Sequence, residues 1–355
     1  MVRVTGNFQS ETALNPLAQE ALLAAMESGW ADPKKIGQVA SKAAALRSNA
    51  TESIAANLGL QADQIEVSGE VGLGYFIALG GFLSAERQLF YGAGDRSGMI
   101  ATSRSHLGKS EIIPLSRNGR LDFSNTNFSS NSILSLQLAN GETGAINHLP
   151  DSLPDDLLIA IDATASGSRV RLPQNWSSAV FDSRSWEGPS GLAIVAISDS
   201  ANWKNPLPHI SAVRRTYGTF SLPLLIASAV ALENFTPDDA KIKTLNKKLR
   251  TKVVQETPST LVAGDLENSL PHLTSFIFSD CNGEEILRGL NDRGIAVDSG
   301  SACTAMNLQP SHVLAAMGLA TDGNIRVTLH AETTSEEVDL LANSLVDVVR
   351  SQQQR

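Results

Sequence analysis

The spacing of apolar positions along the chain predicts two helices followed by a series of short strands. Pro16–Ser28 and Lys35–Leu58 carry apolar residues, with abundant Ala and Leu, at helical spacing. Short apolar runs bounded by Gly, Ser, Asn or Asp follow and are predicted as strands. These runs are Ile65–Ser68, Gln88–Tyr91, Met99–Thr102, Ile112–Leu115, Ile133–Leu138, Leu157–Asp162, Ala179–Asp182 and Leu192–Ile197. Several are apolar throughout, which is typical of strands buried on both faces of a mostly parallel sheet.

The pattern changes in the last third of the chain. Phe220–Leu232 predicts a buried helix, and Asp238–Gln255, with its five lysines and one arginine, predicts a charged helix that hinges two domains. The remaining residues mix strands with helices: strands at Thr274–Phe278 and Ile325–Thr328, and helices at Glu284–Asp292, Pro310–Met317 and Ser335–Val349. Thr334 and Glu337 form a capping-box pattern before the last helix.

Chain length indicates two domains. A single hydrophobic core seldom serves 355 residues, so we expect a large domain over 15–245. A smaller C-terminal domain is expected over 246–355, together with residues 1–14.

Charge and composition narrow the classes of function. The chain has 37 acidic and 28 basic residues, a formal charge of −9 and a pI near 5.2, so no nucleic acid partner is expected. Leu222–Leu232, the most apolar stretch, is too short to cross a bilayer, which takes roughly 20 residues. Met1–Trp30 lacks the pattern of a secretory signal. The two cysteines, Cys281 and Cys303, do not indicate a disulfide framework. We therefore expect a cytoplasmic protein with no membrane partner.

The clearest motif surrounds Cys303. It runs Asp-Ser-Gly-Ser-Ala-Cys-Thr over 298–304 and is followed by Gln-Pro-Ser-His-Val-Leu over 309–314. A lone cysteine is more often a buried structural residue, but small polar neighbours favour an exposed loop that can move. The segment resembles the catalytic loop of cysteine desulfurases, in the class V aminotransferase superfamily. The resemblance implies that Cys303 attacks substrate sulfur.

Further matches follow in the family's order. Arg326, in Asn-Ile-Arg-Val-Thr-Leu, resembles the arginine that binds the substrate carboxylate. Asn140, in Asn-Gly-Glu-Thr-Gly, resembles the residue that contacts the cofactor phenolic oxygen. Asp162 resembles the aspartate that pairs with the pyridine nitrogen, and His106 the histidine that stacks over the cofactor ring. Each match is weak alone; their order and spacing identify the family.

The resemblance implies an architecture and a cofactor. The fold expected is α/β, of the fold-type I aminotransferase class, with a mostly parallel seven-stranded sheet between helices and a smaller C-terminal α/β domain. The implied cofactor is pyridoxal phosphate, and the implied assembly is a homodimer with active sites at the subunit interface. A sulfur-acceptor protein or an active desulfurase is a further implied partner.

One departure from the family concerns the cofactor lysine. In the family this lysine lies just before a Gly-Pro-x-Gly turn, which is present here as residues 188–191, but Ser185 occupies the lysine position. A hydroxyl cannot form a Schiff base with an aldehyde, so standard covalent binding of pyridoxal phosphate is not expected. The neighbouring Trp186 is expected to fill space that a cofactor would occupy.

A second departure concerns the phosphate. The usual Gly-Ala-Thr-Glu cradle at a helix N-terminus aligns with Gly69-Glu70-Val71-Gly72, and Asp182 stands where a phosphate-binding serine is usual. Carboxylates at a helix start compete with phosphate for the same positive field. Arg184 is expected to compensate for one of them, so Gly69, Arg184 and Ser185 complete the candidate cofactor site.

Three functional hypotheses follow. The protein is an active cysteine desulfurase that moves sulfur from L-cysteine to Cys303, or a non-catalytic relative that serves as a scaffold or partner in sulfur transfer, or a relay whose Cys303 accepts sulfur from another protein. No metal site is expected. The histidines without metal-ligand spacing are expected to be structural or on the surface: His148, His209, His272, His312 and His330.

Overall fold

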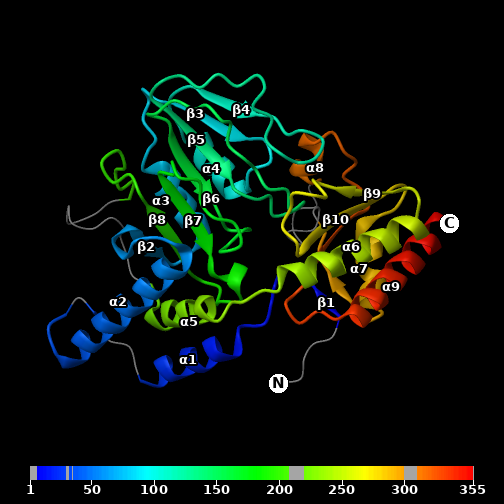
Figure 1. Ribbon diagram of the computed structural model, residues 1–355, viewed down its shortest axis with the longest axis horizontal. Coiled ribbons are helices and arrows are strands. Elements are labelled where there is room, and N and C mark those ends of the chain that lie inside the picture. Colours follow the sequence, from blue (N-terminus) through cyan, green and yellow to red (C-terminus); the bar gives the residue numbers. More distant parts are fainter. Residues whose placement is uncertain (1–5, 29–31, 34, 208–219, 300–309, 355) are drawn as a thin grey trace.

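A seven-stranded sheet forms the larger of two lobes in the computed structural model, which describes residues 6–28, 32–33, 35–207, 220–299 and 310–354 (Figure 1). Its strands lie in the order β2-β8-β7-β6-β5-β3-β4. Their bounds are β2 Ile65–Ser68, β3 Gln88–Gly92, β4 Ser110–Ile113, β5 Ser132–Gln137, β6 Leu158–Asp162, β7 Ser178–Asp182 and β8 Ala193–Ile197. Strand β8 pairs antiparallel with β2 and β7, and the other pairs of this sheet are parallel. The predicted mostly parallel seven-stranded sheet is confirmed.

Helices cover both faces of this sheet. On one face lie α1 (Pro16–Glu27), α2 (Gln38–Leu58) and α5 (Leu222–Glu233), and on the other lie α3 (Val71–Gly80) and α4 (Ser97–Arg104). Alternate residues of a strand point to opposite faces. Accordingly, Phe181 packs in the core with α2 and α5, while Val180 packs in the core with α3.

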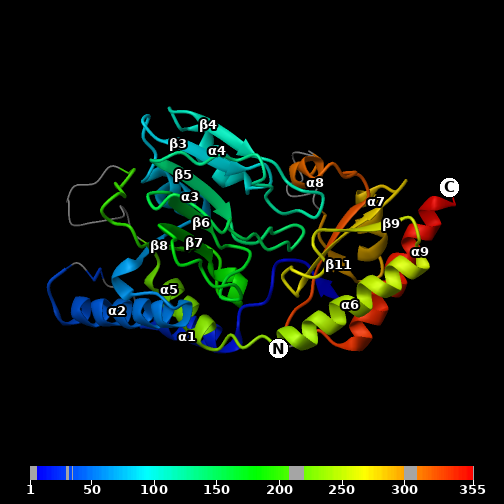
Figure 2. The same ribbon diagram turned by 45° about the horizontal axis from the view of Figure 1, so that its top comes forward.

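The second lobe is built on a three-stranded antiparallel sheet with the order β12-β10-β9. Its strands are β9 Thr260–Ala263, β10 Leu273–Phe278 and β12 Asn324–Thr328, and its helices are α6 Asp239–Glu256, α7 Gly283–Asn291, α8 His312–Ala316 and α9 Ser335–Gln353. A short strand near the N-terminus, β1 (Asn7–Phe8), pairs in parallel with β11 (Ala296–Val297), so the first described residues join this lobe (Figure 2). The capping box of Thr334 and Glu337 is confirmed at the start of α9.

The charged helix α6 belongs to the second lobe from its first turn. Ile242, Leu245 and Leu249 are buried in the core of that lobe together with residues of α9. The change of core therefore falls near residue 239, at the start of α6, and not at the boundary of 245 and 246 that the sequence suggested.

One predicted strand is wrong. Met99–Thr102 lies within α4, where Met99, Thr102 and Ser103 are buried. These positions have the i, i+3, i+4 spacing of one helix face, and the Thr102 hydroxyl donates to the Gly98 carbonyl oxygen one turn earlier (2.9 Å). With four residues, the apolar spacing of Met99–Thr102 does not distinguish a strand from a helix. Ile112–Leu115 is also displaced, since β4 covers 110–113.

In the described part of the chain, no helix is both long and apolar enough to cross a membrane.

Candidate functional site

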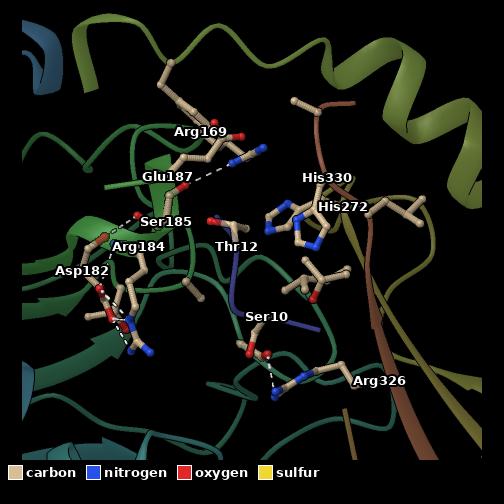
Figure 3. Close-up of a pocket in the computed structure, with 18 of the residues that line it drawn as sticks. Ser10, Thr12, Arg169, Asp182, Arg184, Ser185, Glu187, His272, Arg326 and His330 are labelled. Atoms are coloured by element: carbon tan, nitrogen blue, oxygen red, sulfur yellow. Dashed lines mark hydrogen bonds and ion pairs between the residues drawn. The ribbon is translucent and has the colours of Figure 1, made fainter. Parts of the chain in front are cut away.

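A polar pocket lies between the two lobes, where the carboxyl ends of the parallel strands face the second lobe (Figure 3). The large lobe contributes Arg96 and Ser185 to it, the second lobe contributes Arg326 and His330, and the N-terminal segment contributes Thr12. Ligands of open α/β sheets bind at the carboxyl ends of the strands, which makes this pocket the candidate site. Its volume among the described residues is about 150 Å³, less than the roughly 300–1,000 Å³ typical of ligand pockets.

Ser185 lies in the pocket, at the position where the resemblance implies a lysine. Strand β7 ends at Asp182, and the chain then makes one 3-10 turn, Ser183–Trp186, which ends at Glu187 with a left-handed φ of 61°. The Ser185 hydroxyl donates to the Asp182 carbonyl oxygen (2.7 Å). This side chain is held against its own turn and presents no amine.

No lysine lines the pocket among the described residues. The two longer segments outside them, 208–219 and 300–309, contain no lysine in their sequence. Lys241, at the start of α6, is exposed, and its Nζ donates to the carbonyl oxygen of Ala331, a residue of the pocket wall (3.1 Å). Among the described residues, no lysine from a neighbouring element therefore takes the place of the missing amine.

Asp162 ends β6 beside the pocket and is buried, with 1% of its surface exposed. Its Oδ1 accepts hydrogen bonds from the Thr164 backbone N–H (2.9 Å) and hydroxyl (2.6 Å). Its Oδ2 forms an ion pair with Arg96 Nε at 3.7 Å. Neither of these two atoms has a hydrogen-bond partner in the described structure. The charge of this carboxylate is thus balanced by an arginine of the same chain.

Asn140 is buried in the turn after β5, and its amide is used to build that turn. Its Oδ1 accepts from the backbone N–H groups of Glu142 and Thr143 (both 2.9 Å). Its Nδ2 donates to the Gly94 carbonyl oxygen and to Gln137 Oε1. Gly141, the next residue, lines the pocket instead. The predicted contact of Asn140 with a cofactor stays a prediction, and the geometry gives the side chain a structural role.

Arg326 projects from β12 into the pocket, as the sequence suggested. Its Nη2 pairs with Asp298 Oδ2 (3.0 Å), and its Nη1 donates to the Gly141 carbonyl oxygen (3.4 Å). Asp298 Oδ2 also accepts from the Ser10 backbone N–H (2.8 Å). The guanidinium that would bind a substrate carboxylate therefore already holds a carboxylate of the chain.

Gly69 precedes α3, and Glu70 caps this helix. The Glu70 carboxylate accepts from the backbone N–H groups of Gly72 (2.7 Å) and Leu73 (2.8 Å). Unpaired N–H groups at a helix start are what makes it an anion site. Here the carboxylate of Glu70 already occupies two of these N–H groups, those of Gly72 and Leu73.

Arg184 compensates for Asp182 as predicted from the sequence. Its Nη2 and Nε lie 2.7 and 3.0 Å from Asp182 Oδ2, and the Arg184 backbone N–H also donates to this carboxylate (3.0 Å). Both residues line the pocket, and they do so as a neutral pair.

His106 does not lie in the pocket. It follows the C-terminal end of α4, and its Nε2 is hydrogen-bonded to the Arg87 carbonyl oxygen (2.9 Å). Arg96, which caps the opposite end of the same helix, reaches the pocket. In the described structure Arg96, and not His106, is therefore paired with Asp162. Sequence reasoning missed Arg96 because its position depends on which end of α4 faces the site.

Two histidines expected to be structural, His272 and His330, line the pocket (Figure 3). His272 Nδ1 and His330 Nε2 are buried, with no hydrogen-bond partner in the described structure. Burial lowers the pKa of His272 well below its usual value, and the nearby Arg169 lowers it further. Burial also lowers the pKa of His330. Both rings are neutral at pH 7, so they add polar atoms to the wall without adding charge.

Cys303 lies outside the described residues. The residues on either side of its segment contact the site: Asp298 pairs with Arg326, and the Ser311 hydroxyl donates to Glu142 Oε2 (2.8 Å). Glu142 follows Gly141 of the pocket wall. The described residues on both sides of the Cys303 segment therefore contact residues in or next to the pocket wall.

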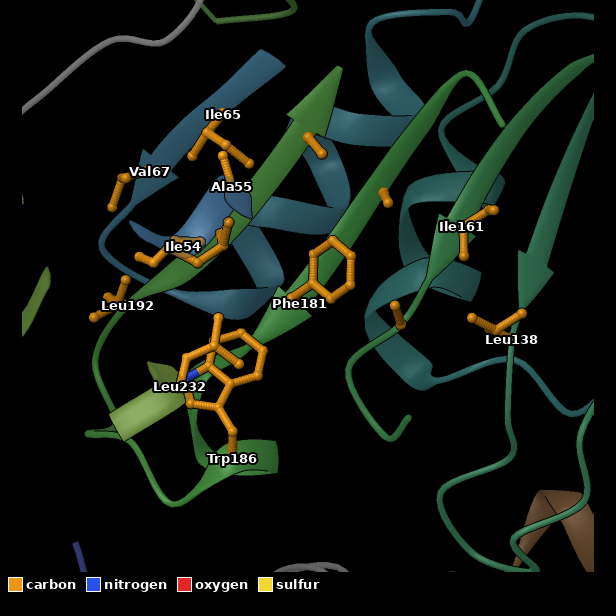
Figure 4. Packing of buried hydrophobic residues seen from close by; sticks show 14 of the residues in the cluster. Ile54, Ala55, Ile65, Val67, Leu138, Ile161, Phe181, Trp186, Leu192 and Leu232 are labelled. Atoms are coloured by element: carbon orange, nitrogen blue, oxygen red, sulfur yellow. The ribbon is translucent and has the colours of Figure 1, made fainter. Parts of the chain in front are cut away.

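Trp186 does not fill the pocket. Its side chain is completely buried in the core between the sheet and α5 (Figure 4). Its ring lies 6.4 Å from that of Phe181. The expectation that it takes the place of a cofactor is wrong. Successive side chains of a 3-10 turn point about 120° apart, so Trp186 is buried in the core while its neighbour Ser185 lines the pocket.

The described residues do not fit pyridoxal phosphate in the family's manner. The amine is absent, the start of α3 is capped by Glu70, and Asp162 and Asp182 are each paired with an arginine. Among the described residues, no cluster of three or more His, Cys, Asp or Glu side chains could hold a metal ion.

Comparisons with known proteins agree with the resemblance. Residues 106–341 match the family model described as aminotransferase class V. The cysteine desulfurase NifS of Azotobacter vinelandii is 29% identical over 67% of this chain and 63% of its own length. A cysteine desulfurase of Bradyrhizobium diazoefficiens is 30% identical over 68% of this chain and 66% of its own. The matched region thus spans less than two thirds of these relatives.

Solved structures share the fold. A NifS-like protein has a TM-score of 0.84 at 20% identity and covers 98% of this chain and 100% of its own. The apo structure of a cysteine desulfurase from Thermococcus onnurineus has a TM-score of 0.76 at 16% identity, covering 98% of this chain and 95% of its own. At these identities the likeness concerns the fold alone, which is the expected fold of the desulfurases.

Proposed function

Because the chain belongs to the aminotransferase class V family, we propose that it is a cysteine desulfurase-like protein that does not form the standard Schiff base with pyridoxal phosphate. In this proposal it acts as a scaffold or partner in sulfur transfer. The family as a whole depends on pyridoxal phosphate, which supplies the electron sink for chemistry at the substrate α-carbon.

The observation that carries the proposal is the serine at position 185. An imine needs a primary amine, and the described pocket wall offers a hydroxyl at this position and no lysine elsewhere. Without the amine there is also no base at this position to move the substrate α-proton. The pairing of Asp162, Asp182 and Arg326 supports the same conclusion, because in the described structure each of these three side chains already lies beside an opposite charge of the chain.

The alternative is an active desulfurase that forms a persulfide on Cys303 and releases alanine. Purified protein mixed with pyridoxal phosphate and L-cysteine distinguishes the two. We expect no alanine or sulfide above a control without protein. After borohydride reduction and mass mapping, we expect only the low, non-saturating labelling typical of exposed lysines, such as Lys241. A class V desulfurase that keeps its lysine is the positive control. Saturable trapping on one lysine would restore the active alternative.

The partner role is tested by capture. With the tagged chain as bait in extract of its own cells, we expect recovery of a lysine-containing desulfurase or a sulfur-acceptor protein. The Cys303→Ser bait is the matched control: binding of a desulfurase should persist, because a scaffold contact does not need the thiol. Recovery of neither class of protein would contradict the partner role. The homodimer and the sulfur relay implied by the sequence stay predictions.

A further inference from the structure

We propose that two side chains of this protein, Glu70 and Arg96, stand in for the charged groups of the missing cofactor, so that the start of α3 and the carboxylate of Asp162 both have their opposite charge without any ligand. Glu70 supplies the anion at the helix start where a phosphate would bind, and Arg96 supplies the cation beside Asp162 where a protonated ring nitrogen would lie. This inference rests on the proposed function and extends it from covalent to noncovalent binding.

Glu70 occupies an anion position that the fold creates. Helix α3 is ten residues long, and its dipole places partial positive charge at its first turn. The two carboxylate oxygens of Glu70 accept one N–H each, from Gly72 and Leu73, at hydrogen-bonding distance. A Cβ on Gly72 would lie 2.9 Å from both oxygens. The glycine therefore leaves room for the chain's own carboxylate.

The start of α3 lies at the same edge of the sheet as the pocket. Ser68, at the end of β2, and Asp182, at the end of β7, both pair with Ala193 of the intervening strand β8. The side chain of Tyr75 in α3 then contacts Thr164 (3.0 Å) and Asp162 (3.5 Å). The five-residue separation of Glu70 and Tyr75 corresponds to about 7.5 Å along the helix. One small molecule could therefore span both positions.

Arg96 supplies the charge that buried Asp162 needs. Burying an unpaired carboxylate is strongly unfavourable, and Arg96 is the cation nearest to the second oxygen of Asp162 in the described structure, at 3.7 Å. The guanidinium also lies against the Gly141 backbone, since a Cβ there would be 2.5 Å from Arg96 Nη2. Its charge therefore occupies the space next to Asp162 on the pocket side.

The same charge balance extends around the pocket. The three remaining arginines of the wall each pair with a carboxylate of the chain: Arg169 with Asp239, Arg184 with Asp182, and Arg326 with Asp298. A dianionic cofactor entering this wall would have to displace pairs that already exist.

The test uses pyridoxamine phosphate, which carries the ring and the phosphate but no aldehyde, so its binding does not depend on a lysine. Calorimetric titration of the wild type should give a Kd weaker than about 1 mM, whereas Glu70→Gly/Arg96→Ala should bind at least about tenfold more tightly. The matched control is Glu86→Gly/Arg104→Ala, which changes the same residue types at exposed positions and should resemble the wild type. Wild-type binding as tight as that of the double variant would overturn the inference. So would a double variant with an unchanged circular dichroism spectrum and no gain in affinity.

Inorganic phosphate provides an independent arm if the double variant does not fold. Glycine is tolerated at an N-cap at small cost, so Glu70→Gly should fold. Its thermal midpoint should rise with phosphate more than the wild-type midpoint does, because the freed N–H groups now bind the anion. An equal response of the two proteins would overturn the role of Glu70. Failure of this test would leave the borohydride result unaffected, so the two proposals can fail separately.

Discussion

Replacing Trp186 by alanine is expected to lower the free energy of unfolding by about 3–5 kcal/mol, the range for truncating a buried aromatic side chain. Trp186 is the largest fully buried side chain among the described residues and packs between the sheet and α5 (Figure 4). Removing it leaves a cavity that the surrounding strands cannot close. Urea or thermal unfolding, followed by circular dichroism, measures the effect.

Phenylalanine variants of two buried tryptophans separate the effect of lost side-chain volume from the effect of a lost hydrogen bond. The Trp186 indole nitrogen has no hydrogen-bond partner in the described structure, whereas the indole N–H of Trp203 donates to the Ile77 carbonyl oxygen (2.9 Å). Trp186→Phe should therefore be milder than Trp203→Phe, because the second change also removes the indole hydrogen bond to the Ile77 carbonyl oxygen, which keeps the Gly81 backbone N–H (3.3 Å). A Trp186→Ala variant as stable as the wild type would mean that Trp186 is outside the core, and would revive its role as a pocket filler.

The second large effect concerns pH and Asp95. This residue follows β3 next to Arg96 and is 1% exposed. Its Oδ2 accepts from the Gly92 N–H (3.1 Å) and the Ser135 hydroxyl (2.8 Å), and Oδ1 is buried without a hydrogen-bond partner in the described structure. Burial raises the pKa of Asp95 to about 7 from the value of 3.8 for an unperturbed aspartate.

The sign of the linkage follows from the direction of this shift. Between the two pKa values the folded state keeps the Asp95 proton and the unfolded state has lost it. The contribution of Asp95 to stability is therefore greatest at acidic pH and falls by about 1 kcal/mol for each pH unit until the folded pKa is passed. Above pH 7 both states are ionised and the contribution becomes constant.

Asp95→Asn isolates this contribution, because the amide oxygen can accept both existing hydrogen bonds without a charge. We expect the variant and the wild type to have similar stabilities near pH 4 and the variant to become the more stable protein as the pH rises towards 7. The quantity to compare is the difference in free energy of unfolding between the two proteins at each pH. The lowered pKa values of His272 and His330 act in the opposite direction, removing stability as the pH falls, and they cancel in this difference. A difference that does not change between pH 4 and 8 would contradict a protonated Asp95.

Several residues that the sequence predicted for the site, and that the structure places in or beside the pocket, stand in strands or beside a turn motif. Asp162 and Arg326 belong to apolar strand runs, and Ser185 is fixed by its distance from the Gly-Pro-x-Gly turn. Such positions are readable because strand period and turn chemistry are local properties. Trp186 shows the limit of this local reading, because the direction of its side chain depends on the dihedral angles of a four-residue 3-10 turn.

The amino-acid sequence by itself determined the mostly parallel sheet, the family motifs, and the absence of an amine at position 185, since these depend on residue identity and on spacing along the chain. The tertiary structure alone decided that Arg96 reaches Asp162 while His106 does not, that Glu70 caps α3, and that His272 and His330 face the pocket. These contacts join residues from different elements, and their partners are fixed only when the packing of helices on the sheet orients each element end toward the cleft or away from it.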